Sequence, residues 1–287
     1  MSDATVGLKA PMPRQRSLPV VRITAEAVPR QAMQDLLEGA RRFPLWLRLA
    51  WYDLRQRFRR SVLGPFWLTL SMGVMVMALG LMTATVFGQD PARGLPYIAT
   101  GLVCWGLISN AINDGTTVFT AAEGFIRNVP LPLSVHLYRM LARNVMIFGF
   151  NLVIYLVVLV WFRLNPGWGV LLALPGLALL VLNASWMALA AGVLSTRYRD
   201  IPQLISNLLQ VVFFLTPIFW SPATLPRRLA FIEFNPLYHL VEVVRAPALG
   251  EPVPAQSWLF CIGFAVLGCA ATALLYRRAH ARLAYWV

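Results

Sequence analysis

The histidine side chains of this sequence are too dispersed for hydrolytic or metal chemistry. The three histidines, His136, His239 and His280, lie far apart, and neither His-Glu-x-x-His nor Gly-x-Ser-x-Gly occurs. The first motif would place two zinc ligands on one helical face, and the second would expose a serine nucleophile on a sharp turn. We therefore expect no catalytic residue and no metal site, which argues against an intramembrane protease or glycosyltransferase.

The lysine content excludes a P-loop nucleotide site. Lys9 is the only lysine among 25 basic residues, and it stands in Val-Gly-Leu-Lys-Ala, without a glycine-rich phosphate loop. A P-loop needs a lysine after its glycines to reach the β- and γ-phosphates. We therefore expect no cofactor in this chain. Cys104, Cys261 and Cys269 lie in apolar runs without Cys-x-x-Cys spacing, so we interpret them as buried hydrophobic residues.

The composition is that of a polytopic, all-α membrane protein. Hydrophobic residues make up 58% of the 287 residues and charged residues 13%, against roughly 45–50% and about 25% in soluble domains. A helix needs about 20 apolar residues to cross a hydrocarbon core of ~30 Å. Six stretches reach that length, and we predict six transmembrane helices at 65–88, 97–121, 144–162, 170–194, 201–221 and 257–276.

The basic residues predict the orientation. Twenty of the 25 lie in the N-terminal region or in the segments after the second, fourth and sixth predicted spans. Because arginine and lysine are enriched in cytoplasmic loops, this alternation places both termini in the cytoplasm. The basic excess follows from topology, so we expect membrane lipids and no nucleic acid as partners.

Two further regions lie outside the predicted spans: the N-terminal region and the stretch around Pro236. Residues 1–40 carry arginines among prolines and no continuous apolar run, so we expect a disordered cytoplasmic tail before a single transmembrane domain at 41–287. The stretch 229–249 contains Glu233, Glu242 and Arg245, and each charge would cost ~2.5–3.5 kcal/mol at a bilayer centre. We therefore predict an outer loop at 222–256 with two short helices split at Pro236, and no seventh span.

Residues 41–60 are predicted to form an amphipathic helix. Apolar residues recur at helical spacing, and Tyr52, Arg55 and Arg59 lie on another stripe. One interpretation is a juxtamembrane anchor at the interface. The other is that Arg55, Arg59 and Arg60 receive an anionic lipid head group, because guanidinium groups bind phosphate through paired donors. Gly64 then breaks the chain before the first span.

Five segments in order resemble those of a known family. They are Arg-Arg-Ser-Val-Leu-Gly-Pro-Phe-Trp at 59–67, Ala-Glu-Gly-Phe-Ile-Arg-Asn-Val-Pro-Leu-Pro at 122–132, Arg-Tyr-Arg-Asp-Ile-Pro at 197–202, Leu-Thr-Pro-Ile-Phe-Trp at 215–220 and Asn-Pro-Leu at 235–237. From about residue 40 onwards, the chain resembles permeases of type-2 class ABC exporters for lipid-linked polysaccharides such as O-antigen, capsule, teichoic acid and galactan. No single motif is decisive, but their order on a matching topology is specific.

The resemblance implies a half-transporter in the bacterial cytoplasmic (inner) membrane. Two copies would enclose a channel and bind two copies of a separate ATP-binding cassette subunit, which would hold ATP and Mg²⁺. The substrate would be a polyprenyl-pyrophosphate-linked glycan, with Tyr52, Arg55, Arg59, Arg60 and Gly64 at its lipid-pyrophosphate site. The alternative is an ion-coupled secondary transporter, which would need interrupted helices around a charged midplane site.

The loop 122–135 carries the predicted ATPase coupling element. Glu123 and Arg127 are spaced for an i,i+4 ion pair on one helical turn, and Phe125 and Ile126 are expected to be exposed. From the residues alone, this is a cytoplasmic loop with a surface ion pair. The resemblance implies a coupling helix that docks into the ATPase.

The channel prediction depends on two kinds of side chain. Asn110 and Asp114 share a polar face of the second span, which suits either interhelical hydrogen bonds or pore lining. Asp114 has no acidic or histidine neighbour in sequence, which disfavours a proton relay. Aromatic residues at outer span ends ordinarily form an interfacial belt. The resemblance implies that some line a glycan path, with Phe87, Trp105, Phe213, Phe214 and Phe219 as candidates. It also implies an outer gate, for which the candidates are Asn235, Pro236, His239 and Glu242.

Overall fold

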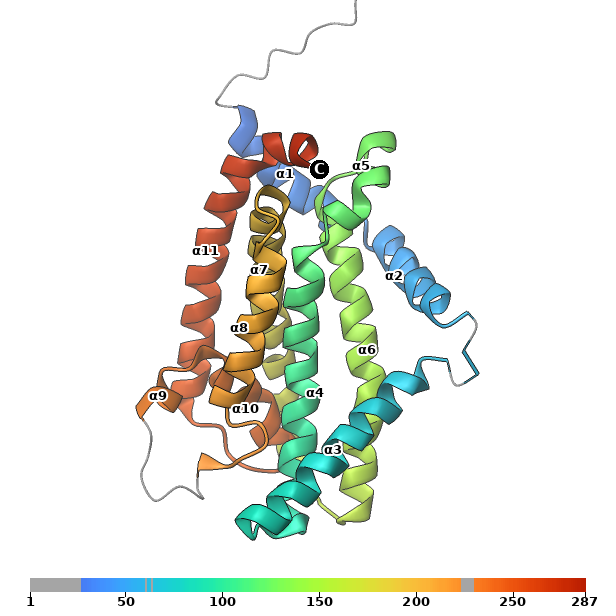
Figure 1. The fold of residues 1–287 in the computed structure, drawn as a ribbon. Coiled ribbons are helices and arrows are strands. Elements are labelled where there is room, and N and C mark those ends of the chain that lie inside the picture. The colour runs from blue at the N-terminus through green and yellow to red at the C-terminus, as the bar shows by residue number, and fades with distance from the viewer. Residues whose placement is uncertain (1–26, 60, 63, 223–229) are drawn as a thin grey trace, which may run out of the picture.

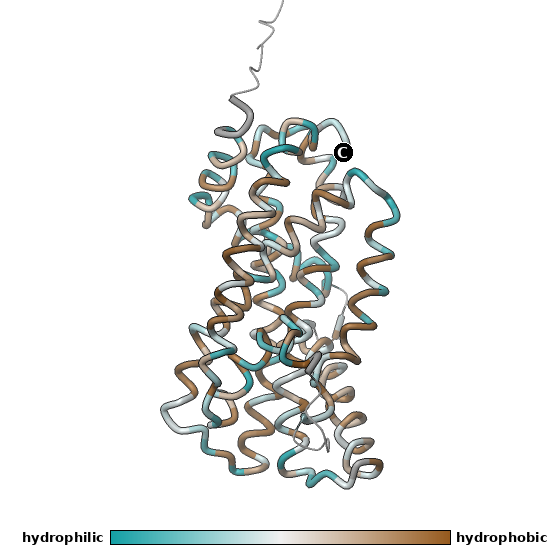
Figure 2. Tube along the Cα trace, turned by 90° about the vertical axis from the view of Figure 1, so that its left-hand side faces the viewer, coloured by the Kyte–Doolittle hydropathy of each residue, from teal (hydrophilic) through white to brown (hydrophobic). Residues whose placement is uncertain are grey.

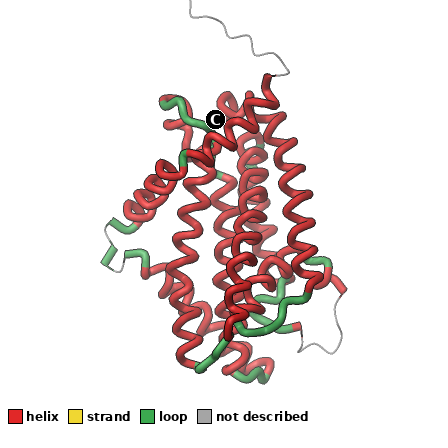
Figure 3. The backbone as a smooth tube through the Cα atoms, turned by 180° about the vertical axis from the view of Figure 1, so that it is seen from behind, coloured by secondary structure: helices red, strands yellow, loops and turns green. Residues whose placement is uncertain are grey.

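The computed structural model describes residues 27–59, 61–62, 64–222 and 230–287. All regular secondary structure in these residues is helical, and the long helices form one bundle (Figure 1). Most connecting segments lie at the two ends of that bundle, but the connection after helix α2 (Phe43–Arg57) lies at its side (Figure 3). One end carries the last turn of α11 and the short helix α5, and we call it the α5 end. The other carries α10 and is called the α10 end.

Five helical segments are long and apolar enough to cross a membrane. They are α3 (Phe66–Phe87), α4 (Pro91–Thr116), α6 (Ser134–Trp161), η2 with α7 (Gly167–Leu172 and Ala173–Arg197) and α11 (Ala255–Trp286). In Figure 2 these helices are hydrophobic for most of their length, whereas hydrophilic segments gather at the two ends. The chain is therefore a multi-pass membrane protein.

The predicted span boundaries need correction at four helices, one of which is α11: it continues to Trp286, whereas its predicted end is residue 276. The second span starts at Pro91 and ends at Thr116, and the third starts at Ser134 rather than at residue 144. Arg139 and Arg143 therefore lie in a spanning helix and not in the preceding loop. The fifth span, predicted to end at residue 221, is the helix α8 (Ile201–Leu215), which ends at Leu215.

Helix α8 is short because of the sequence Thr216-Pro217. Proline has no N–H, and its ring disfavours helical geometry in the residue before it. Thr216 is accordingly extended, with ψ 131°. At ~1.5 Å per residue, the 15 residues of α8 span about 22 Å, which is shorter than a hydrocarbon core of ~30 Å. The structure therefore confirms an apolar helix here but not a sixth full-length span.

Helix α4 forms the centre of the bundle. Of its most apolar window, 78% is buried, against 22% for the windows of α3 and α11. It packs most closely on α7, where a Cβ atom on Gly115 would lie 2.7 Å from the Cα atom of Ala188. Small residues at such a crossing let two helix backbones approach, which is the usual basis of helix association in membranes.

The N-terminal region is more ordered than the sequence predicts. Residues 27–41 form helix α1 (Ala27–Arg41), and α2 (Phe43–Arg57) follows after one residue. The predicted disordered tail is therefore wrong for residues 27–40, and its first 26 residues lie outside the described part of the chain. Helix α1 lies across the α5 end against α6 and α11 (Figure 1).

Asp35 fastens α1 to the bundle. Its carboxylate accepts hydrogen bonds from the backbone N–H groups of Leu133 at 2.7 Å and Ser134 at 3.0 Å, so it caps the start of α6. It also accepts one from the Tyr276 hydroxyl at 2.8 Å. Burial raises the pKa of Asp35, but nearby His280 and the hydrogen bonds from Ser134 and Tyr276 lower it, and the net pKa lies below the usual value.

At the other end, α9 (Ala230–Glu233) and α10 (Pro236–Ala248) lie within the predicted outer loop. Helix α10 has 13 residues and is too short to span a membrane, as the sequence analysis predicted. Ten of its residues are buried, and it packs against α4, α7 and α11. Its backbone is thus covered by protein, which a short helix inside a membrane requires.

Candidate functional site

The predicted coupling segment forms a short helix at the α5 end. Thr120–Ala122 is a 3₁₀ turn (η1), and Glu123–Asn128 is the helix α5, in which Arg127 pairs with Glu123 at 2.8 Å. Arg127 also donates to the backbone carbonyl of Val287 at 3.0 Å. The Phe125 side chain is 49% exposed, as expected. Ile126 differs from the prediction, because it is half-buried and packs against the core.

Helix α2 presents its predicted phosphate-binding residues to the outside. Tyr52 is 61% exposed, and Arg55 and Arg59 are exposed as well. Gly64 has φ +56°, a conformation that favours glycine, and nothing lies within 4 Å of its Cβ position. Arg60 lies outside the described residues. The opposite side of α2, with Ala50 and Leu54 buried, rests on α6.

A chain of charged side chains links α2, α6 and α4 just inside the α5 end. Arg139 donates through Nε to Asp53 at 2.6 Å, and its Nη2 atom also binds this carboxylate. Arg143, one turn further along α6, lies 3.7 Å from Asp53 and donates to Asp114 at 2.9 Å. Asn144 donates to the same Asp114 oxygen at 3.0 Å.

These contacts change the interpretation of Asp114. The sequence leaves it without an obvious partner, but the structure pairs it with Arg143 from a helix that begins 20 residues later. Asn110 lies one turn before it on α4 and is exposed. A cavity of about 120 Å³ adjoins the charged chain, with Asp53, Asp114, Phe125, Arg139 and Arg143 among its lining residues. Asp53, Arg139 and Arg143 are not among the residues predicted from the sequence, although the two arginines have i,i+4 spacing.

Four of the five candidate channel aromatics form one cluster. The Phe213 ring contacts the rings of Trp105 at 5.6 Å, Phe214 at 5.4 Å and Phe219 at 5.7 Å between centroids. Trp105 is only 8% exposed, whereas Phe214 is 58% exposed. Within one copy of the chain, Phe214 is therefore the ring most accessible to a ligand. The side chain of Phe87 lies outside the described residues.

Helix α8 exposes two different stripes. Gln203, Asn207 and Gln210 recur at helical spacing and are exposed, as is Phe214 beside them. The second exposed stripe is apolar and consists of Leu204, Leu208, Val211 and Leu215. Only Leu209 is fully buried, against α4 and α7. Helix α8 is thus half-covered in a single copy.

The predicted outer-gate residues lie at the start of α10 and along it; His239 is buried, whereas Asn235, Pro236 and Glu242 are half-buried. Asn235 caps α10 by accepting from the Leu237 N–H at 3.0 Å, and donates to the Thr216 hydroxyl at 3.0 Å, so it ties α10 to the end of α8. Pro236 occupies the first turn of α10. His239 is 3% exposed, lies 3.0 Å from the Ser257 hydroxyl and stacks on Phe260 at 4.5 Å.

Arg245, one turn along α10 from Glu242, is a further buried residue at this end and is not among the residues selected from the sequence. Its side chain is 1% exposed and binds Glu242 at 2.5 Å and the backbone carbonyl of Pro217 at 2.7 Å. The guanidinium also lies 3.8 Å from the ring centroid of Tyr97. Pro217 lies beyond the last residue of α8, so its carbonyl has no helical partner. Arg245 and the Tyr97 hydroxyl, at 3.2 Å, both donate to this carbonyl.

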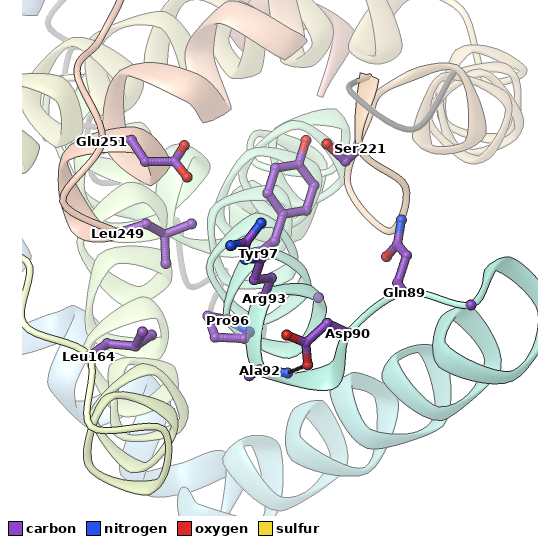
Figure 4. A pocket seen from close by; sticks show the side chains of 12 residues that line it. Gln89, Asp90, Ala92, Arg93, Pro96, Tyr97, Leu164, Ser221, Leu249 and Glu251 are labelled. Atoms are coloured by element: carbon purple, nitrogen blue, oxygen red, sulfur yellow. Dashed lines mark hydrogen bonds between the residues drawn. The ribbon is translucent and has the colours of Figure 1, made fainter. Parts of the chain in front are cut away.

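A cavity of about 630 Å³ opens beside Tyr97 at the α10 end (Figure 4). Its polar lining comes from the α3–α4 connection, α4, the segment after α8 and the α10–α11 connection. Figure 4 shows the side chains of Gln89, Asp90, Arg93, Tyr97, Ser221 and Glu251 around it. This end of the molecule therefore offers a recess with a mixed lining, in which these polar side chains lie beside apolar residues such as Pro96, Leu164 and Leu249.

Comparison with known proteins defines the class. Residues 44–249 match the family model of the ABC-2 type transporter, and the chain belongs to this family of ABC transporter membrane proteins. It is 24% identical over 206 residues to an O-antigen export system permease protein, RfbA, from Myxococcus xanthus, covering 70% of this chain and 79% of that protein. An RfbA of the same description from Klebsiella pneumoniae is 23% identical over 198 residues, covering 66% and 74%. The predicted family is therefore confirmed.

Proposed function

We propose that this protein is the channel-forming permease subunit of an ATP-driven exporter that moves a polyprenyl-pyrophosphate-linked polysaccharide outward across the bacterial cytoplasmic membrane. The observation that carries the proposal is the similarity to O-antigen export permeases over 70% of a multi-pass chain. The sequence lacks a P-loop lysine, so a separate ATP-binding cassette subunit supplies ATP hydrolysis, with its ATP and Mg²⁺.

The exposed faces of α8 support a homodimer. A single copy leaves both the polar stripe of Gln203, Asn207 and Gln210 and the apolar stripe of α8 uncovered. In our proposal, a second copy covers the apolar stripe about a two-fold axis, because closed two-fold symmetry is the commonest arrangement of identical subunits. The polar stripe and Phe214 then face the glycan path, with Asn110 and Asp114 deeper in it. Phe213 and Phe219 support Phe214.

The α5 end is proposed to face the cytoplasm and the ATPase. Most of the arginines lie in segments at this end, in agreement with the positive-inside rule. Phe125 is an exposed aromatic ring beside the ion pair of Glu123 and Arg127, and such rings often dominate the binding energy of an interface. Two copies of the ATPase would contact the two copies of α5.

The exposed residues of α2 are proposed to receive the substrate's pyrophosphate. Tyr52, Arg55 and Arg59 are exposed beside the start of the first span, and Arg60 and Gly64 follow them. Arginine can bind two phosphate oxygens at once, and an interfacial helix places its guanidinium groups at head-group depth. At the opposite end, α9 and α10 form the outer gate, which Asn235 connects to α8.

Reconstitution tests the proposal directly. The chain is co-expressed with an ATP-binding cassette subunit, purified and placed in proteoliposomes that contain a fluorescent polyprenyl-pyrophosphate glycan. We expect ATP-dependent movement of the glycan, and no movement without the ATPase. Movement driven by an ion gradient in vesicles that contain this chain alone would instead establish the secondary-transporter alternative and overturn the proposal.

A further inference from the structure

One guanidinium group, that of Arg139, contacts two segments that are otherwise separate. It binds the Asp53 carboxylate of α2 through two nitrogen atoms, with the Nε–Oδ2 distance at 2.6 Å. The same guanidinium lies 5.6 Å from the centroid of the Phe125 ring of α5. An arginine over an aromatic face is attracted by the negative potential of the ring. Arg139 therefore connects α5 and α2 through a single side chain.

The contact chain continues from α2 into the centre of the bundle. Arg143 lies 3.7 Å from Asp53 and 2.9 Å from Asp114, so the two carboxylates share this arginine. Asp114 belongs to α4, the most buried helix of the bundle. The order of contacts is thus Phe125, Arg139, Asp53, Arg143 and Asp114, from the bundle end inward.

The four charged side chains of this contact chain are partly buried, which leaves them free to change position. The side chains of Asp53, Arg139 and Arg143 are 12%, 21% and 25% exposed, and that of Asp114 is 36% exposed. Fully buried ion pairs are fixed by the cost of separating charges in a medium of low dielectric constant. Here the pairs are partly exposed, and the cavity of about 120 Å³ beside them leaves room for displacement.

Besides Arg139, α2 and α5 both contact α6 through aromatic rings: Trp46 lies 6.0 Å from the Tyr138 ring, and Phe125 lies 6.2 Å from the His136 ring. Ala50 and Leu54 are the buried residues of α2, and α5 has none. A displacement of Phe125 therefore either breaks its contact with Arg139 or moves that side chain. Because the arginine fork fits the carboxylate in one orientation, a shift of Arg139 is passed on to Asp53.

We propose that Arg139 is a positioning residue that couples movement of α5 to the position of α2, with Arg143 extending the link to Asp114. This inference rests on the proposed function, in which α5 docks the ATPase and α2 receives the lipid head group. In this inference, the partly exposed charges of Asp53, Arg139 and Arg143 make binding of the substrate at α2 depend on movement of the ATPase at α5.

The test is Arg139→Lys in the purified complex with the ATPase subunit, in proteoliposomes containing a polyprenyl-pyrophosphate glycan. Lysine keeps the charge but cannot reproduce the two-nitrogen contact. We expect ATP hydrolysis within about 2-fold of the unsubstituted complex and glycan exported per ATP lower by about 10-fold, as when an interaction of ~1.4 kcal/mol is lost. Arg278→Lys, at an exposed arginine of α11, is the matched control and should behave like the unsubstituted complex.

A second measurement separates coupling from folding. Asp53→Asn is compared in the natural background and in the Arg139→Gln background. If Asp53 acts through Arg139, the Asp53→Asn substitution changes the glycan exported per ATP much less in the Arg139→Gln background. The reason is that the effects of substitutions at coupled sites are not additive.

Three results would overturn the inference. The first is an unchanged amount of glycan exported per ATP in Arg139→Lys, and the second is a loss in the double variant equal to the product of the two single losses. The third is that Arg139→Lys loses ATP hydrolysis and complex formation together with export. Failure of the proposed function is distinguishable, because it would appear in the unsubstituted complex as an absence of ATP-dependent export.

Discussion

Arginines at the two ends of the bundle are held in different ways. At the α10 end, Arg245 is 1% exposed and is bound to Glu242, the Pro217 carbonyl and the face of Tyr97. At the α5 end, Arg139 and Arg143 are 21% and 25% exposed and are shared among carboxylates of two helices. The contacts of Arg245 stabilise a single side-chain geometry, whereas Arg139 and Arg143 can adopt more than one pairing with the nearby carboxylates.

This difference follows from the groups that each arginine binds and from how exposed they are. Arg245 binds the Glu242 carboxylate and shares the Pro217 carbonyl with the Tyr97 hydroxyl, so removing it leaves Glu242 without its charged partner. Arg139 and Arg143 bind carboxylates that are partly exposed, so exchanging one ion-pair partner for another costs less free energy there. We therefore expect substitutions at the α10 end to act mainly on stability, and those at the α5 end mainly on activity.

The largest effect is expected for Arg245→Met. It leaves Glu242, 14% exposed, without its partner, and breaking a buried pair from one side typically costs about 3–5 kcal/mol. The variant should unfold at a much lower temperature in detergent, as measured by tryptophan fluorescence. The double variant with Glu242→Gln should recover part of the loss. A variant as stable as the natural protein would contradict the assigned role of Arg245.

A smaller effect, on assembly rather than stability, is expected for Phe125→Ala. The ring is 49% exposed, so its removal should leave the unfolding temperature unchanged. Truncating an aromatic anchor costs about 1–2 kcal/mol of binding, or roughly 10-fold in affinity for the ATPase subunit. Affinity is measured by titrating labelled ATPase onto the permease in nanodiscs. Phe234→Ala, at an exposed phenylalanine of the α10 end, is the control and should bind normally.

Asp35 gives the α5 end a pH-dependent attachment. Its pKa is lowered in the folded protein, so its contribution is present above the unfolded value near 3.8 and is lost as the pH falls through the folded value. Asp35→Asn should destabilise the docking of α1 by about 1–2 kcal/mol at neutral pH, because charged hydrogen bonds are lost. Hydrogen exchange of residues 31–41 should report this. A difference between variant and natural protein that does not shrink as the pH falls from neutral to well below 3.8 would contradict it.

Apolar periodicity predicted most of the fold, because long hydrophobic runs in a membrane protein have few alternative structures. Five predicted spans correspond to long helices, and the rejection of a seventh span agrees with α10. The errors lie where polar residues extend helices. The start of α6 at Ser134 was missed because Arg139 and Arg143 interrupt the apolar run, and their partner Asp53 lies 86 residues earlier.

The site was predicted less completely than the fold. The aromatic cluster could be anticipated, because Phe213, Phe214 and Phe219 are close in sequence. The partners of Asp114 and the role of Arg245 could not, because each depends on pairing between distant helices. Helix α1 was missed because its amphipathic pattern is short and its fastening residue, Asp35, acts on the start of another helix.

The smallest stability effect is expected for Glu123→Gln. The ion pair of Glu123 with Arg127 has side chains 48% and 60% exposed, and exposed pairs contribute about 0–1 kcal/mol. Thermal unfolding of the permease alone should therefore match that of the natural protein. If the same variant weakens ATPase binding, the carboxylate acts in the interface, because its intramolecular role is too small to explain the loss. Equal binding and equal stability would confine the α5 contact to Phe125 and its neighbours, and would remove Glu123 from the coupling element.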